Sequence, residues 1–253
     1  MKMSPEVLKK RYDAAWNRKE NWRSLYEQCY QYGLPQRNLY DGYHEGGVGG
    51  QSKGSHVFDS TAVAGVQKFA NRIQSGLFPP DKRWMDLQPG TDIPEEQMDV
   101  VRDGLQHYTD KFFTLLRQTN FDLAMGEFLM DLCVGTGVML VQPGDETNPI
   151  TFQAIPQYLV ALEEGPKGTV ENVYRKVRIP ADGYYVCHKD DTDTAMLVYR
   201  RLKISPWIVS RYMKVSGEVY GRGPMTQCIF DVLSLNKTME LLLKNASLNI
   251  AGV

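Results

Sequence analysis

The spacing of apolar residues changes from a helical period to a strand period and back again along this chain of 253 residues. Apolar side chains recur every three or four residues within 6–134, which is typical of amphipathic helices. Short apolar runs bounded by Pro and Gly follow within 138–213, as expected for strands. The helical period returns from Pro224 to about Asn249. This segregation predicts an α+β fold in which long helices pack with a small mixed or antiparallel β region.

Gly and Pro residues divide the helical part of the chain into separate segments. The first segment carries large rings and ends at Gly33 and Pro35. Asp59-Ser60-Thr61 is expected to cap the second segment, which ends at Pro79-Pro80. The helices are therefore expected at about 6–32, 59–78, 94–118 and 121–134. A solvated face is expected for the basic residues of the first helix, namely Arg11, Arg18, Lys19 and Arg23.

The middle of the chain favours strands joined by tight turns. Gly165-Pro-Lys-Gly168 is typical of a hairpin turn, and Asp190–Thr194 predicts a second hairpin tip. The expected extended segments are 138–142, 151–155, 158–163, 170–179, 183–189, 195–203 and 205–213. The expected organisation is a mainly helical region at 1–137 with a mobile loop at 40–55, a β-rich region at 138–216 and a long C-terminal helix at 217–253.

Composition argues against several classes of protein. Lys and Arg number 29 against 30 Asp and Glu, giving a formal net charge of −1, whereas a dedicated nucleic-acid module is usually far more basic. No apolar run approaches the ~18 residues of a membrane span, and the first residues show no signal-peptide pattern, so no membrane partner is expected. The four cysteines form no C-x-x-C pair, which argues against a disulfide framework or a zinc site. Cys133 and Cys228 have apolar neighbours and are expected to be buried.

The candidate catalytic and ligand-binding motifs lack residues that their chemistry requires. The Gly-rich stretch 46–54 contains Lys53, but its neighbours do not complete the P-loop pattern G-x-x-x-x-G-K-[ST]. Gly221-Arg-Gly-Pro-Met resembles half of a dinucleotide fingerprint and is more simply the start of a helix. The acidic cluster at 190–193 lacks the glycine and glutamate of a calcium-binding loop. We therefore expect no enzyme activity, no cofactor and no metal site.

The last helix is apolar on more than one side. Apolar residues recur along one face, and three consecutive leucines extend the apolar surface around the axis: Leu241, Leu242 and Leu243. A helix of this kind is expected to pack between two neighbours. A mixed charged stripe lies beside them, formed by Lys237, Glu240 and Lys244.

A series of short motifs follows the chain in a particular order. The motifs are Tyr32-Gly-Leu-Pro35, Val57-Phe-Asp-Ser-Thr-Ala62, Ser75-Gly-Leu-Phe-Pro-Pro80, Trp84-Met-Asp-Leu87, Asp131-Leu-Cys-Val-Gly-Thr-Gly137 and Gly217-Glu-Val-Tyr-Gly-Arg-Gly-Pro224 before Leu235-Asn-Lys237. In this order they resemble the head-to-tail connector, or portal, proteins of short-tailed (podovirus) bacteriophages over nearly the whole chain. Members of that family are longer, and extra polypeptide is expected between Ile179 and Gly183.

The resemblance implies a portal-protein fold assembled as a ring, usually of twelve identical subunits, at one vertex of the capsid. Such a ring nucleates capsid assembly, contacts the major capsid protein and the terminase large subunit, passes double-stranded DNA during packaging and ejection, and holds the tail adaptor proteins. The implied location is the virion, with assembly in the host cytoplasm. A subunit charge near zero is compatible with a channel in which DNA slides, because each neutralised phosphate would add affinity.

In such a ring the final helix is expected on the channel side. Lys237, Glu240 and Lys244 are then the candidate DNA-channel face, and Leu241–Leu243 the candidate subunit interface. For the charged residues, an ordinary solvated face with i, i+4 pairing is the alternative. For the whole chain, the alternatives are a monomeric α+β nucleotide-binding enzyme that uses 46–54 and an interaction scaffold without a channel. Native mass separates a ring from a monomer of 28.8 kDa.

Overall fold

The computed structural model describes residues 4–38, 54–146, 148–176, 180–181, 184–185 and 205–251. Its described part contains long helices and short antiparallel strands, which confirms the α+β fold class. The helices are α1 (Pro5–Gly33), α2 (Thr61–Leu77), α3 (Glu95–Arg117), α4 (Phe121–Val134) and α5 (Pro224–Ala251), with short 3-10 turns η1 (Pro35–Arg37) and η3 (Gln157–Leu159). Each of the expected helices is therefore present, with ends within a few residues of those predicted.

The strands form small antiparallel sheets. The strands are β1 (Thr136–Pro143), β2 (Ile150–Ala154), β3 (Val160–Glu164), β4 (Val170–Arg175), β5 (Pro180–Ala181), β6 (Tyr184–Tyr185) and β7 (Trp207–Arg211). The three-stranded sheet has the order β2-β1-β7, so that β1 is its central strand. The first five residues of β1 are buried. The turn predicted at Gly165–Gly168 joins β3 to β4, and Gly168 has the positive φ of 75° that such a turn requires.

The structure corrects some of the expected element ends. The strand predicted to start at Tyr158 starts at Val160, because the 3-10 turn η3, which follows Pro156, occupies Gln157–Leu159. At the start of α2, the carboxylate of Asp59 accepts a hydrogen bond of 3.0 Å from the backbone N–H of Thr61, whereas the Ser60 side chain makes no cap. The loop expected at 40–55 lies almost wholly outside the described residues, as do the segments 195–203 and 190–194 and most of 183–189.

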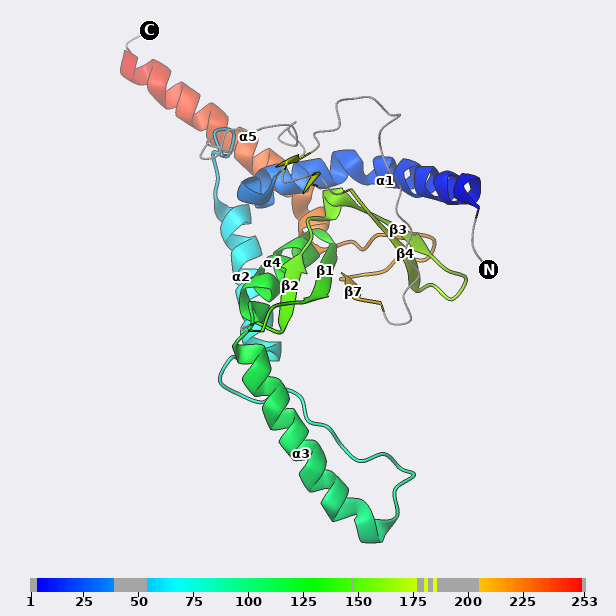
Figure 1. Ribbon diagram of the computed structural model, residues 1–253. Helices are drawn as coiled ribbons and strands as arrows, with labels where there is room; N and C mark the ends of the chain where they lie inside the picture. Colours follow the sequence, from blue (N-terminus) through cyan, green and yellow to red (C-terminus); the bar gives the residue numbers. More distant parts are fainter. Residues whose placement is uncertain are drawn as a thin grey trace.

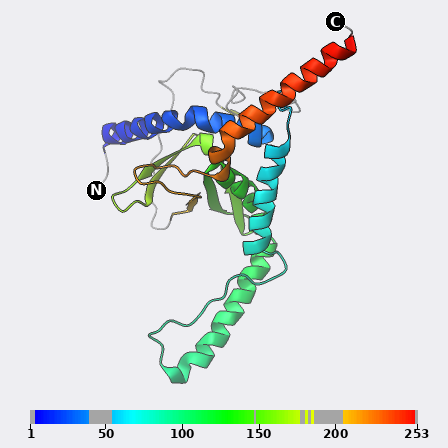
Figure 2. The same cartoon turned by 180° about the vertical axis from the view of Figure 1, so that it is seen from behind.

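Two helices extend away from a central body (Figure 1). In this body, α1 lies across α4 and the sheets, and α2 runs down one side. α5 starts inside the body, passes α1 and continues outward to the C-terminal end, while α3 extends in the opposite direction with residues 78–94 beside it. The view from behind shows the same two projections (Figure 2). The described part of the molecule is therefore elongated, and a large part of α5 projects beyond the other described elements.

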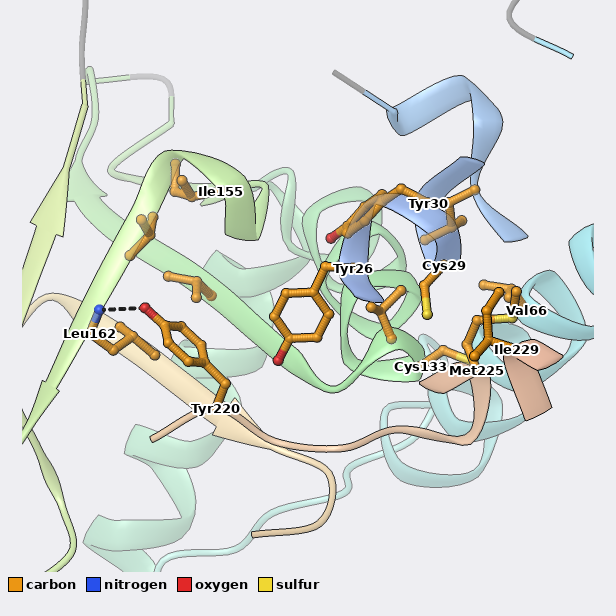
Figure 3. Close-up of a cluster of buried hydrophobic side chains, with 14 of the residues drawn as sticks. Tyr26, Cys29, Tyr30, Val66, Cys133, Ile155, Leu162, Tyr220, Met225 and Ile229 are labelled. Carbon is orange, nitrogen blue, oxygen red and sulfur yellow. Dashed lines mark hydrogen bonds between the residues drawn. The ribbon is translucent and has the colours of Figure 1, made fainter. Parts of the chain in front are cut away.

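The main hydrophobic core joins the first and last helices of the chain. Side chains from α1, α2, the end of α4, β1 and β3 pack there with the start of α5 (Figure 3). Tyr26, Tyr30 and Ile229 are completely buried in this core. A second cluster, centred on Phe113, Phe121 and Phe128, attaches the C-terminal end of α3 to α2 and α4. The position of α5 is consequently fixed by the main core, and the position of α3 by the second cluster.

Candidate functional site at the final helix

The chain enters α5 through a close backbone contact with the end of α4. A Cβ atom at Gly221 would lie 2.3 Å from the carbonyl oxygen of Gly135, and one at Gly223 would lie 2.1 Å from that of Cys133. The backbone N–H of Gly223 donates to the carbonyl of Val134 at 3.1 Å. We call Gly135, Gly221 and Gly223 the glycine crossing. It explains why these glycines belong to two motifs far apart in the sequence, and it gives Gly221-Arg-Gly223 a packing role.

Aromatic side chains of α1 and the segment before α5 hold the glycine crossing in place. The Tyr26 hydroxyl donates to the carbonyl oxygen of Gly221 at 3.1 Å. The Tyr220 hydroxyl accepts a hydrogen bond of 3.1 Å from the backbone N–H of Leu162, as Figure 3 shows. Burial raises the pKa of Tyr220 to about 12, so its hydroxyl stays protonated at neutral pH. The rings of the first helix therefore serve packing and hydrogen bonding around the start of α5.

A buried carboxylate fixes the end of α4 at the same place. Asp131 is fully buried, and its oxygens accept hydrogen bonds of 2.7 Å from the Tyr30 hydroxyl and 2.7 Å from Arg37 Nη2. Arg37 also contacts Glu127 Oε2 through Nη1 at 2.9 Å. Burial raises the pKa of Asp131, whereas the charge of Arg37 opposes that rise. Since Asp131 precedes the glycine crossing by one helical turn, this cluster holds α4 against α1 where α5 begins.

Lys19 is buried, which contradicts its expected place on a solvated face. Its side chain is 6% exposed, and its ammonium group donates hydrogen bonds to the backbone carbonyls of Gln157 and Val160. The ammonium also lies 5.0 Å from the centre of the Trp16 ring, and burial lowers its pKa. The expectation failed because the partners of Lys19 come from η3 and the start of β3, about 140 residues later in the chain.

The part of α5 from Leu235 to Ile250, which we call the shaft, exposes apolar side chains on several sides. Leu241, Leu242 and Leu243 are 54%, 56% and 53% exposed. Successive residues of a helix are about 100° apart, so these three leucines point to three different sides and a single partner helix cannot cover them all. Apolar surface of this extent on a projecting helix is typical of a protein–protein contact.

The charged stripe beside the leucines consists of ion pairs within the helix. Lys237 Nζ lies 2.9 Å from one carboxylate oxygen of Glu240, and Lys244 Nζ lies 2.5 Å from the other. Hydrogen bonds from Lys244 and Lys237 lower the pKa of Glu240. The i, i+4 pairing expected for a solvated face is present, while the prediction that these residues face DNA stays a prediction.

A comparison with protein-family models identifies the family of the chain. The family model described as bacteriophage head to tail connecting protein matches residues 6–185 and 181–252. The chain belongs to this family. The connector is thus a structural component of a phage, and its family is not one of enzymes. A search of the curated proteins finds no match to the chain.

Two of the motifs found in the sequence of the connector come together at the start of α5. The two segments that the family model matches overlap at 181–185. The motif at 131–137 supplies the buried carboxylate and one side of the glycine crossing, and the motif at 217–224 supplies the other side. These two motifs of the connector therefore hold α5 on the body.

Further predictions for the connector concern cysteines, metals and membranes. Cys133 is buried as expected, but the prediction for Cys228 is wrong, because this residue of α5 is exposed. Within the described residues, no group of His, Cys, Asp or Glu side chains is arranged to hold a metal ion. None of the helices in the described ranges is both long enough and apolar enough to span a membrane. The acidic cluster at 190–193 and most of the stretch 46–54 lie outside the described residues.

The charged residues Lys19, Arg37 and Asp131, of which Lys19 and Asp131 are buried, were not among the sequence-based site candidates. Asp131 had a recognisable signal, since it is a lone carboxylate within the apolar stretch Phe128–Val134. A single charge among buried positions requires a partner, and Arg37 is that partner. Lys19 had no such signal, because it stands among other charged residues of α1.

Proposed function

We propose that the chain assembles into a ring at one vertex of a phage capsid and forms a conduit for double-stranded DNA during packaging and ejection. In this role the ring contacts the major capsid protein, provides the docking surface for the terminase large subunit and holds the tail adaptor proteins. Membership of the head to tail connector family supports the proposal. The short-tailed type of phage and assembly in the host cytoplasm follow from the sequence resemblance and belong to the same proposal.

The single observation that carries the ring is the exposed shaft of α5. A closed cyclic assembly uses two different surfaces of each subunit, one for each neighbour. Leu241 and Leu242 lie on different sides of the shaft and are about equally exposed, at 54% and 56%. Each therefore offers apolar surface to a different neighbour, and the interface proposed at Leu241–Leu243 is divided between two copies.

The dimensions of a helix are compatible with a DNA channel. Packed helices have axes about 8–10 Å apart, so twelve shafts side by side would lie on a circle of radius about 15–19 Å. Subtracting a helix radius of about 5 Å leaves a clear radius of about 10–14 Å, which is comparable with the radius of a duplex. Twelve subunits is the number implied by the family resemblance and is part of the proposal.

The test is the native mass of the purified protein and of two matched variants. Sedimentation velocity should give a particle many times heavier than the 28.8 kDa chain, and electron micrographs should show a central hole. Leu242→Glu should dissociate the particle, because it puts a charge into an apolar contact. Thr238→Glu adds the same charge on a polar side of the same helix and should leave the particle intact. A wild-type species near the mass of one chain would refute the ring, and an unchanged mass for Leu242→Glu would refute the interface.

Two other functions give different results in the same experiment. A monomeric nucleotide-binding enzyme would sediment as a single chain, and its candidate loop at 46–54 lies almost wholly outside the described residues. The family match does not favour it. An interaction scaffold would form particles without a central hole.

A further inference from the structure

One side of α5 carries polar but almost uncharged residues on most of its turns. Residues spaced alternately by about three and four positions share one side of a helix. Six exposed polar residues of α5 lie within about 60° of one another around the axis: Gln227, Asp231, Ser234, Thr238, Asn245 and Asn249. On the turn between Thr238 and Asn245, the edges of this side are occupied by Leu241 and Leu242. We call the six polar residues the polar stripe. Its one charged member is an acid close to the body.

An apolar strip borders the polar stripe on each side. One strip contains Leu235 and Leu242, which are 44% and 56% exposed, and the other contains Phe230, Leu241 and Leu248, which are 70%, 54% and 56% exposed. With about 100° between successive residues, the polar stripe lies between the two strips. If each strip contacts a different neighbour, the polar stripe remains uncovered.

The polar stripe points away from the body of its own subunit. Ile229 is completely buried in the main core, and Asn236 is 6% exposed. The Asn236 side-chain oxygen accepts hydrogen bonds from the backbone N–H groups of Phe58 at 2.7 Å and Asp59 at 3.2 Å. Asn236 and Thr238 are two residues apart and therefore lie on nearly opposite sides of the helix. The body consequently occupies the side of α5 opposite to the polar stripe.

The following inference rests on the proposed ring. The body is much wider than the shaft (Figure 2), so shafts can pack side by side around a narrow hole only if the bodies lie outside it. We propose that the polar stripe, rather than the stripe of Lys237, Glu240 and Lys244, lines the channel and faces the DNA. In this arrangement the charged stripe lies on the side toward the body and the wall.

The chemistry of the polar stripe suits a surface along which a duplex slides. The hydroxyl groups of Ser234 and Thr238 donate to the helix carbonyls of Phe230 and Ser234, each at 2.9 Å, so their protons are not directed at phosphates. The stripe contains no lysine or arginine. Each phosphate that a protein neutralises adds salt-dependent affinity, so a lining without cations lets the duplex pass without being held.

The direct test places a gold label on chosen sides of α5 in assembled rings. Cys187 and Cys228 are first changed to serine, and Thr238→Cys, Asn245→Cys or the control Ser247→Cys is added and labelled with maleimide gold. Ser247 is exposed and lies on the opposite side of the shaft from Asn245. In axial views we expect gold inside the hole for positions 238 and 245 and outside the wall for 247. The reverse pattern would overturn the assignment, whereas failure of the unlabelled parent protein to form rings would overturn the proposed function itself.

A second measurement needs no label. Asn245→Lys should make rings bind duplex DNA more tightly, with the slope of log affinity against log salt steeper by about 0.9 for every phosphate newly contacted. Ser247→Lys adds the same charge on the other side and should leave the slope unchanged. Equal slopes for the two variants, or a steeper slope for Ser247→Lys alone, would contradict a channel lined by the polar stripe.

Discussion

Replacing Gly223 with alanine should destabilise the connector strongly. The new Cβ atom would lie 2.1 Å from the carbonyl oxygen of Cys133 and 2.7 Å from its carbonyl carbon. A carbon and an oxygen atom in contact need about 3.3 Å, so the two backbones must separate by about 1 Å. The separation strains the hydrogen bond of 3.1 Å from Gly223 N–H to the carbonyl of Val134. Overpacking costs about 1–3 kcal/mol, and a buried hydrogen bond left open costs about 1–3 kcal/mol more.

The expected loss in the free energy of unfolding is therefore about 4 kcal/mol, which for a chain of this size lowers Tm by about 8–16 °C. The matched control is Gly104→Ala in the middle of α3, where a Cβ atom would meet nothing within 4 Å. That change should raise the free energy of unfolding by about 0.5–1 kcal/mol, because alanine favours helix over glycine. Scanning calorimetry of both variants in the same assembly state measures the difference. If Gly223→Ala melts with the wild type, the glycine crossing does not have the close contact described above.

Three further predictions concern buried or paired charges. Asp131→Ala takes the buried carboxylate away from Arg37 and the Tyr30 hydroxyl, while Arg37 keeps its ion pair with Glu127. The free energy of unfolding should fall by about 1–3 kcal/mol, measured by urea denaturation; an unchanged value would contradict this role. Burial alone would raise the pKa of Glu163, but hydrogen bonds, first of all from Arg11, outweigh it and lower the pKa below its ordinary 4.5. Ionised Glu163 therefore contributes to the free energy of unfolding above pH 4.5, and this contribution is lost as the pH falls through the lowered pKa. Glu163→Gln should accordingly flatten the acid limb of a Tm–pH profile. Lys19→Met keeps the stem but removes the ammonium donor from two buried backbone carbonyls, of which that of Gln157 still accepts the backbone N–H of Val160. Thermal melts should show a loss of about 1–3 kcal/mol; an increase in Tm would refute it.

The helices of the connector could be predicted from sequence because their signals are local. The apolar spacing in α2 and α4, with Pro and Gly at the ends, requires no knowledge of distant residues. The hairpin turn at Gly165–Gly168 was predictable for the same reason. By contrast, the burial of Lys19 depends on the carbonyl of Gln157, which is distant in sequence. No local pattern carries that information.

The candidate site divides in the same way. The spacing of Lys237, Glu240 and Lys244 was sufficient to predict their ion pairs, and the run Leu241–Leu243 was sufficient to predict apolar surface around the axis. Neither pattern says which side of α5 faces the body. Asn236 looks like an ordinary polar residue, and only its hydrogen bonds to Phe58 and Asp59 fix the orientation of the helix.

By itself, the amino-acid sequence determined where helices and strands form and which faces of α5 are apolar, because these properties depend on residues within one or two turns of each other. Only the tertiary structure decided that Gly135 meets Gly221 and that α5 leaves the body with its shaft exposed. That contact joins two backbones whose residues are more than 80 positions apart. No local pattern in the sequence indicates that two such distant backbone segments lie in contact, because their contact follows from the packing of the whole core.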